Sequence, residues 1–239
     1  MTRHHPPTEL LLDFAAGGVS EAVALAVACH AEMCDACRAE IRDYERVGGA
    51  LFETLEPEPV DDALLERVLD RLDEPEPDVR AAPAMASDTA SLIPGPLVRY
   101  LVGGLDQLPW RRVGKLFEEF RLPLAGNGFK AKLMRLQPGA VMPLHTHRGQ
   151  EYTLVLAGGY ADQGEQFLPG DFDVRDPSHK HQPVVDDDGE CLCLVVLDAP
   201  VKLTGVLGRI VNPFLRVYVP LSSCLRRENR RWPEHATDS

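Results

Sequence analysis

The sequence predicts an all-α domain followed by an all-β domain, and three observations lead to this prediction. Residues 21–47 form a proline-free run rich in Ala, Glu and Arg, which is typical of a helix. Beyond residue 97, short β-type runs alternate with Gly, Pro and Asp turns, and no long helical segment separates them. This pattern is typical of an antiparallel sandwich or barrel. Between the two parts, residues 73–96 are rich in Pro, Ala, Ser and Asp without periodicity, as in an exposed linker. We place the helical domain at 1–78, the linker at 79–96, the β domain at 97–220 and a basic tail at 221–239.

The helical domain is expected to contain a short helix, a long helix and an amphipathic helix. The first runs from Thr8, its cap, to Ala16 and ends at a glycine pair. Ser20 caps the second, which is predicted to continue as one helix to Gly48-Gly49. The last begins at Asp61 or Asp62, and its apolar residues lie on one stripe: Leu64, Leu65, Val68, Leu69 and Leu72. In the β domain the expected strands lie in the runs FKAKLMRLQPG, EYTLVLAGG, EQFLPGDFDV, ECLCLVVLDAP and VKLTGVLG.

The charge of the chain is concentrated in its first third. Residues 1–79 hold 19 acidic and 6 basic side chains, a net charge of −13, whereas the whole chain of 239 residues carries −12. Such a domain repels nucleic acid and favours a basic partner, so we expect no direct DNA binding. There is no apolar run long enough to span a bilayer, and the N-terminus lacks the apolar region of a signal peptide. We therefore expect a cytoplasmic protein that does not bind membranes.

The stretch ACHAEMCDACRAE contains His30, Cys34 and Cys37, spaced four and three residues apart. On one continuous helix these three side chains share a face, and two thiolates with an imidazole favour tetrahedral Zn²⁺. A closed site needs a fourth ligand, for which His4, His5 and Cys29 are candidates. Cys29 points about 100° away around the helix, so a histidine that folds across from the N-terminal segment fits better. The alternative is that the cysteines are small buried apolar residues and the histidine a satisfied polar one.

This pattern, a histidine near the N-terminus followed by H-x3-C-x2-C on a helix in an acidic helical domain, resembles the zinc-binding anti-sigma family. The resemblance covers about residues 1 to 75. It implies that His5 is the fourth ligand of a structural Zn²⁺. It also implies that the domain holds an extracytoplasmic-function sigma factor inactive.

A second group of possible ligands lies in residues 139–158, which match G-x5-H-x-H-x3-E-x6-G at every fixed position. His145 and His147 lie two apart on a strand and face the same side, and Glu151 can return a carboxylate to that side. A third histidine, His179 or His181, would complete a site of three nitrogens and one oxygen. Such donors suit zinc, iron, manganese, nickel or copper, and we expect a divalent metal, Zn²⁺ before the others. The alternative is an exposed H-x-H in a turn.

The spaced motif resembles the first motif of the cupin β-barrels over roughly residues 95 to 210. Of the second cupin motif, the PGD turn at 169–171 is present, but the histidine comes late and the closing asparagine is missing. The place of His181 before Gln-Pro resembles that of the histidine in cupins attached to anti-sigma domains. We therefore expect His181 rather than His179 to be the ligand, with His179 as the alternative.

Cys191 and Cys193 form a C-x-C pair on a predicted strand, with both side chains on one face. Each is expected to fill the core of the β domain. As a pair they could instead sense redox state, because a metal nearby lowers the pKa of a thiol.

An acidic helical zinc domain, a linker and a C-terminal cupin in one chain resemble the ChrR-type anti-sigma factors. This resemblance implies a regulator without enzymatic activity that binds one sigma factor per chain. The leucine stripe would be part of the binding surface, and loss of zinc would unfold the small domain and release the partner. The cupin domain would be needed for release and a transcriptional response under oxidative stress.

Two other functions compete with this interpretation. A cupin-type metal-dependent dioxygenase would hold catalytic iron at His145, His147, Glu151 and His181, with the helical domain as an accessory. A zinc-dependent transcription factor would bind DNA itself, which the arginine-rich tail favours and the acidic domain opposes.

Overall fold

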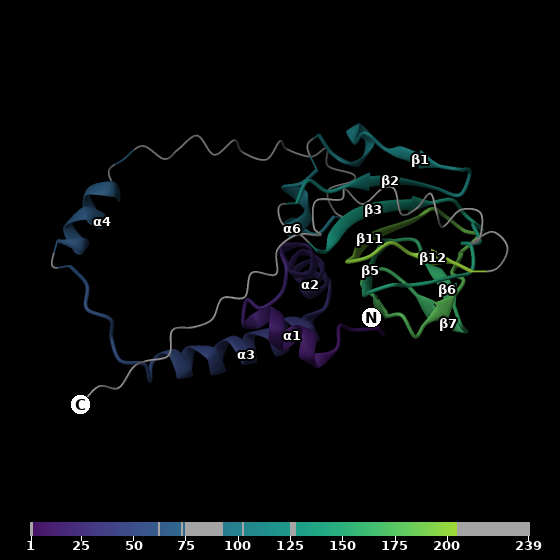
Figure 1. Ribbon diagram of the computed structural model, residues 1–239. Helices are drawn as coiled ribbons and strands as arrows, with labels where there is room; N and C mark the ends of the chain where they lie inside the picture. The colour runs from purple at the N-terminus through teal and green to yellow at the C-terminus, as the bar shows by residue number, and fades with distance from the viewer. Residues whose placement is uncertain are drawn as a thin grey trace, which may run out of the picture.

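The computed structural model describes residues 2–61, 63–72, 74, 93–101, 103–124 and 128–204. The predicted order, helices first and strands after them, is confirmed (Figure 1). The helical elements are α1 (Thr8–Ala15), α2 (Glu21–Met33), α3 (Asp35–Phe52), α4 (Leu64–Leu72), α6 (Gly95–Val98) and the 3₁₀ turn η1 (Leu105–Gln107). Residues 79–92 of the predicted linker and the predicted tail 221–239 lie outside the described residues. No described helix is both long and apolar enough to cross a bilayer.

The long second helix is in fact two helices, so the prediction of one continuous helix was wrong. The chain leaves the helical conformation at Cys34, which has φ −132° and ψ 104°, and α3 begins at the next residue. Over the seven residues from His30 to Cys37, a straight helix would advance about 10.5 Å. The break lets the ligand atoms on its two sides come much closer than that. The predicted end at Gly48-Gly49 was also wrong, because α3 continues through both glycines to Phe52.

The N-terminal caps of the helices agree only in part with those predicted from the sequence. The side chain of Ser20 accepts a hydrogen bond from the Val23 amide at the start of α2, as predicted. Asp61 accepts from the Ala63 amide just before α4. At α1, however, Pro7 occupies the cap position and Thr8 is already in the helix, so Thr8 is not the cap.

The β domain is antiparallel throughout its described pairs, as predicted. A six-stranded sheet has the order β1 (Arg111–Val113), β2 (Phe117–Arg121), β3 (Lys130–Leu136), β11 (Cys191–Leu197), β5 (Glu151–Ala157), β8 (Phe172–Arg175). A second, three-stranded sheet has the order β10 (Val184–Val185), β6 (Tyr160–Asp162), β7 (Glu165–Phe167). A third sheet, also three-stranded, has the order β12 (Lys202–Leu203), β4 (His145–Thr146), β9 (Lys180–His181). Within the described residues the three sheets do not close into one continuous barrel. β1, β2, β6 and β10 were not predicted.

Both faces of the six-stranded sheet are covered. Along β11, Leu192, Leu194 and Val196 pack with the helices in one core, whereas Cys191, Cys193 and Val195 belong to a second core inside the β domain. This explains the continuous apolar run CLCLVVL, because a strand buried on both faces loses the usual alternation.

The helix that covers the sheet is α2, which lies beside β11 and β5 (Figure 1). It is buried around most of its circumference, with Ala26, Val27 and Cys29 inaccessible to solvent. On another side α6 packs against it, and the Gly95 amide donates to Glu32 at 2.9 Å. The two domains therefore share one hydrophobic core. Helix α4 differs: none of its residues is buried, and it stands away from the sheets and the other helices.

Two candidate metal centres

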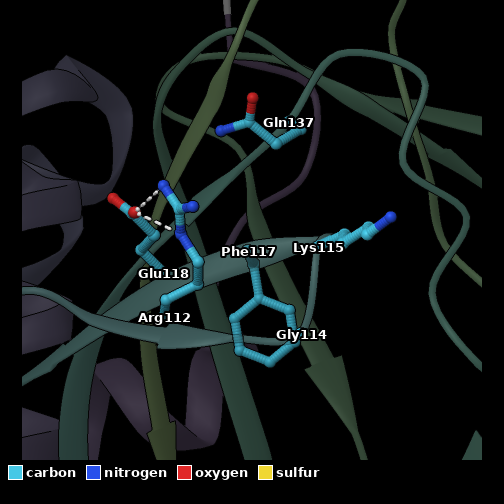
Figure 2. Close-up of a pocket in the computed structure, with 6 residues that line it drawn as sticks. All are labelled: Arg112, Gly114, Lys115, Phe117, Glu118 and Gln137. Atoms are coloured by element: carbon cyan, nitrogen blue, oxygen red, sulfur yellow. Dashed lines mark hydrogen bonds and ion pairs between the residues drawn. The ribbon is translucent and has the colours of Figure 1, made fainter.

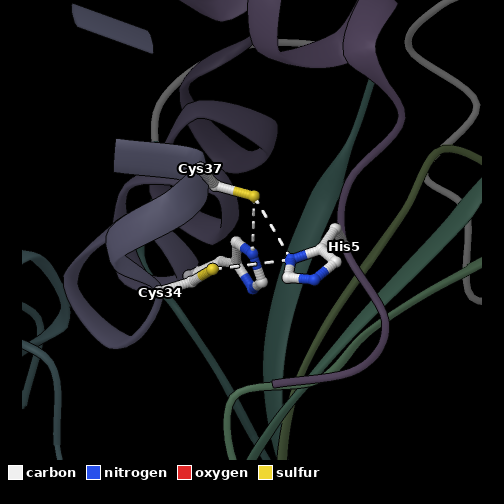
Figure 3. A group of neighbouring side chains, drawn as sticks. His5, Cys34 and Cys37 are labelled. Atoms are coloured by element: carbon white, nitrogen blue, oxygen red, sulfur yellow. Dashed lines mark hydrogen bonds between the residues drawn. The ribbon is translucent and has the colours of Figure 1, made fainter. Parts of the chain in front are cut away.

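The first centre gathers one side chain from each of four positions in the helical domain. His5 comes from the extended segment before α1, His30 from the last turn of α2, Cys34 from the break, and Cys37 from the first turn of α3. Their ligand atoms all lie within 4.8 Å of one another. Nδ1 of His5 is 3.4 Å from the sulfur atoms of both Cys34 and Cys37 (Figure 3). Nε2 of His30 is 3.3 Å from Sγ of Cys37. Nitrogen and sulfur ligands of a tetrahedral zinc ion lie about 3.5 Å apart, so the four donors fit such an ion.

The competing candidates for the fourth ligand lie elsewhere. The ring of His4 points into the β domain, where its centroid is 4.3 Å from that of Phe167. The Cys29 thiol is buried and outside the cluster, and burial raises its pKa to about 12. The structure thus brings together the four residues that the sequence had singled out and leaves the alternatives apart.

Burial favours the uncharged forms of two donors of this cluster, His30 and Cys37, when no cation is present. It lowers the pKa of His30 to about 4. Burial, with the neighbouring Cys34, raises the pKa of Cys37 to about 12. A divalent cation among these groups favours the neutral imidazole and the thiolate, the forms that bind metal.

The second centre is formed where β4 and β9 pair and β5 begins. The register of the pair places His145 directly opposite His181, His147 follows β4, and Glu151 is the first residue of β5. The ligand atoms of these four residues also lie within 4.8 Å of one another. Nε2 of His147 is 2.9 Å from Nε2 of His181, and Nδ1 of His147 is 3.6 Å from the Glu151 carboxylate. The H-x-H pair is therefore buried in a cluster rather than exposed in a turn.

The other histidine of this region, His179, does not join the cluster. Its Nδ1 bonds to the Asp176 carboxylate at 2.9 Å, and its side chain is 38 % exposed. The imidazole of His181 is 3 % exposed and points inward.

An outer layer of hydrogen bonds orients the second cluster. Nδ1 of His181 donates to Asp162 at 2.8 Å, which leaves Nε2 free to bind an ion. The same carboxylate lies 3.0 Å from the guanidinium of Arg175, which also contacts Asp173. On the other side, Nδ1 of His145 donates to a backbone carbonyl. Sequence reasoning missed Asp162, Asp173 and Arg175, because no fixed spacing links them to the ligands.

The groups of the second cluster have shifted pKa values. Burial lowers the pKa of His147 and His181 to about 4. Burial raises the pKa of Glu151 to about 7. In the absence of a cation His147 and His181 are therefore neutral near pH 7, whereas Glu151 is about half protonated there.

These shifts predict how the stability of the metal-free protein depends on pH. Between pH 6.5 and 4.5, unfolding lets His30, His145, His147 and His181 take up protons, because burial lowers the pKa of each in the folded state, whereas Glu151 loses the proton that the folded state holds. The unfolded state thus gains protons net, so the free energy of unfolding should fall as pH falls, by on the order of 3 kcal/mol per pH unit. Urea unfolding in excess chelator measures this slope. Glu151→Gln removes the opposing group and should steepen it, whereas a flat profile in both proteins would contradict the prediction.

The C-x-C pair lies in the core of the β domain. Cys191 and Cys193 are buried, and their sulfur atoms are 3.5 Å apart as free thiols. The hydrogen bond between the Cys193 thiol and Cys191, together with burial, raises the pKa of Cys193 well above its usual value. This favours a packing role, and redox sensing by the pair stays a prediction.

A separate pocket lies at the β1–β2 edge of the large sheet (Figure 2). Its volume is about 330 Å³, and an ion pair between Arg112 and Glu118 lies along its wall. The lining residues are Arg112, Gly114, Lys115, Phe117, Glu118 and Gln137. None of them belongs to either cluster, so the pocket is not part of the candidate metal centres.

Large apolar side chains are exposed along the end of α3 and on α4. Their exposed fractions lie between 38 % and 75 %. They are Val47, Leu51, Phe52, Leu55, Val60, Leu64, Leu65, Val68, Leu69 and Leu72. We call this set the α3–α4 surface. The set follows the chain from the end of α3 through the connecting segment to α4 and is not one continuous patch, because α4 stands away from α3 (Figure 1). Exposed apolar side chains in such a series are typical of a segment that binds another protein.

Comparisons with known proteins cover both domains. Residues 100–200 match the family model of the ChrR cupin-like domain. The chain is 37 % identical over 215 residues to the anti-sigma-E factor ChrR of Cereibacter sphaeroides, an alignment that covers 90 % of this chain and 99 % of the relative. The structure is similar to a chain in the crystal structure of Rhodobacter sphaeroides SigE in complex with the anti-sigma ChrR. There the TM-score is 0.71 at 35 % identity, covering 83 % of this chain and 100 % of that one. This protein belongs to the ChrR family of anti-sigma factors.

Proposed function

We propose that this chain is an anti-sigma factor that binds one extracytoplasmic-function sigma factor through its helical domain. The observation that carries the proposal is the likeness, across both domains, to ChrR, whose matching crystal structure is a complex with SigE. The chain itself offers a surface for such a partner. The α3–α4 surface is apolar, and it belongs to a part of the chain with a net charge of −13, which favours a basic partner.

We assign Zn²⁺ to the cluster of His5, His30, Cys34 and Cys37. A bound zinc ion would supply a cross-link, because its bonds to two thiolates and two imidazoles join four separate positions of the chain. His5 ties the N-terminal segment to the junction of α2 and α3, and this fixes the direction in which α3 leaves. Since α3 carries part of the α3–α4 surface, the cluster controls where the α3 part of that surface lies.

We assign a divalent metal, with Zn²⁺ favoured, to His145, His147, Glu151 and His181. Three neutral imidazoles and one carboxylate offer it a net charge of −1 in a buried site, and Asp162 holds the His181 ring in the orientation that binding needs. The role proposed for this half is to enable release of the sigma factor under oxidative stress. The cupin dioxygenase is not favoured, because the similar proteins that cover the whole chain are anti-sigma factors.

The choice between His181 and His179 gives a direct prediction for the second centre. We expect His181→Ala to lose one equivalent of bound metal, since it removes a buried donor, and His179→Ala to retain it. Metal content after dialysis against a weak chelator measures the difference. The two variants are a matched pair, and loss of metal from His179→Ala alone would reverse the assignment.

Affinity purification of the tagged chain from a lysate of its native host tests the proposed function. The tagged chain should co-purify with an extracytoplasmic-function sigma factor at a 1:1 ratio, identified by mass spectrometry and light scattering. Adding the purified chain should then inhibit transcription by that sigma factor and leave the housekeeping sigma factor active. Absence of a sigma factor, together with oxygen uptake on small diketones or flavonols, would establish the dioxygenase instead.

A further inference from the structure

The turn Gly170–Phe172, which leads into β8 of the β domain, lies directly against the metal cluster of the helical domain. Two ligand-bearing segments contact it. One is the last turn of α2, through the ring of His30, and the other is the N-terminal segment that carries His5. These contacts cross from one domain to the other over more than 130 residues of sequence.

The first contact sets the tautomer of His30. Its Nδ1 lies 2.8 Å from the carbonyl oxygen of Gly170, and because a carbonyl only accepts, Nδ1 carries the proton. Nε2 is then the basic nitrogen, and it is the atom that faces Cys37 in the cluster. A backbone carbonyl that fixes a ligand histidine in this way is a recurrent outer-shell partner of metal sites.

The remaining contacts hold the segment that carries His5. Oδ1 of Asp171 accepts hydrogen bonds from the amides of Arg3 and His4, at 2.6 Å and 3.0 Å. The amide of Phe172 donates to the carbonyl of His4 at 3.0 Å, as in a short strand pairing. The chain therefore reaches His5 from a backbone already fastened to the β domain.

Asp171 is itself built into the turn. Its side chain is buried, and its second oxygen accepts from the Leu168 amide at 2.9 Å. Gly170 has φ +94°, a conformation that favours glycine, and a Cβ there would come within 3.0 Å of the Thr2 hydroxyl oxygen. The turn is thus shaped for close approach of the N-terminal segment.

We propose that the turn Gly170–Phe172 is the outer shell of the N-terminal metal centre and that Asp171 is the positioning residue for His5. Metal retention by the helical domain then depends on a residue of the cupin-like domain. This inference rests on the proposed function, which places a metal ion in that cluster.

Cobalt substitution of the full chain tests the inference. Co²⁺ bound by thiolates gives a near-ultraviolet charge-transfer band. Of the two candidate centres only the N-terminal one has sulfur donors, so the band reports on that centre. Asp171→Ala should weaken Co²⁺ retention there about tenfold or more in competition with a chelator. Asp176→Ala is the control, because that carboxylate also accepts from a backbone amide, but its partners are Ser178 and His179 and not the segment that carries His5. Cys34→Ser with Cys37→Ser gives the baseline.

A second pair of variants leaves the β domain untouched. Arg3→Pro removes the amide that donates to Asp171, whereas Arg3→Ala removes the same exposed side chain and keeps the amide. We expect Arg3→Pro to retain Co²⁺ several-fold less tightly than Arg3→Ala, with the same thermal unfolding of the β domain. Equal retention by these two variants would overturn the inference even if Asp171→Ala failed to fold. A wild-type chain without the thiolate band would instead refute the N-terminal metal site itself.

Discussion

Replacing both Cys34 and Cys37 with serine should abolish metal binding at the N-terminal cluster and with it the capture of the sigma factor. Two thiolates are lost from a four-donor site, and structural zinc sites contribute on the order of 10 kcal/mol to the folding of small domains. The junction of α2 and α3 is held at this point by the cluster, so the direction of α3 should become undefined. Zinc content and partner capture of the double variant measure both effects.

Cys29→Ser is the matched control for this experiment. Cys29 lies on α2, one residue before His30, and is at least as buried as Cys34 and Cys37, but it is outside the cluster. We expect it to lower stability modestly, since it buries a hydroxyl, and to leave the zinc equivalent and the partner in place. Capture of the sigma factor by the double variant would show that the metal is dispensable for binding.

Leu65→Asp combined with Leu69→Asp on α4 should abolish sigma-factor binding without unfolding the protein. Both leucines are more than half exposed, at 66 % and 52 %, and α4 buries none of its residues within this chain. The substitutions should therefore change the free energy of unfolding by only about 0.5 kcal/mol. Two central apolar contacts replaced by charge should weaken the complex about 100-fold or more.

Binding by calorimetry or surface plasmon resonance, together with thermal unfolding, separates the two effects. Val141→Asp is the control, because this residue is 48 % exposed but lies in the β domain. It should bind the sigma factor as the wild type does. If the α4 variant bound normally, the leucine stripe would lie outside the interface, and the partner surface would have to be sought on α3 or elsewhere.

The side chains that gather in the two clusters could be singled out from the sequence, but the backbone that brings them together could not be predicted. The spacing H-x3-C-x2-C and the H-x-H…E pattern already limit which side chains can meet. The break at Cys34 leaves no trace in composition, since its neighbours Met33 and Asp35 are compatible with a helix and no glycine or proline is near. Local propensity favours a continuous helix there, and tertiary contacts override it. At Gly48-Gly49 local propensity favours the end of a helix, but α3 continues, because a helix tolerates two glycines at a cost of about 1 kcal/mol each.

The outer-shell residues show a different limit of sequence reasoning. Asp171 was visible as part of the PGD turn, but nothing in the sequence linked it to a segment that begins 168 residues earlier. Asp162 and Arg175 were likewise hidden, because their pairing follows from how β6 and β8 lie around the second cluster. Contacts of this kind depend on topology rather than on spacing along the chain.

The burial of α2 on several sides has a consequence for how such proteins can evolve. Its side chains must fit α1, α3, α6 and the sheet at once, so a change in β11 or β5 calls for a matching change in α2. The two halves are therefore poor candidates for exchange by recombination between distant family members. A chimera that joins the helices of one protein to the cupin-like domain of another would inherit a mismatched core. We expect the two sides of the α2–sheet contact to change slowly and in concert within this family, because each side must keep fitting the other.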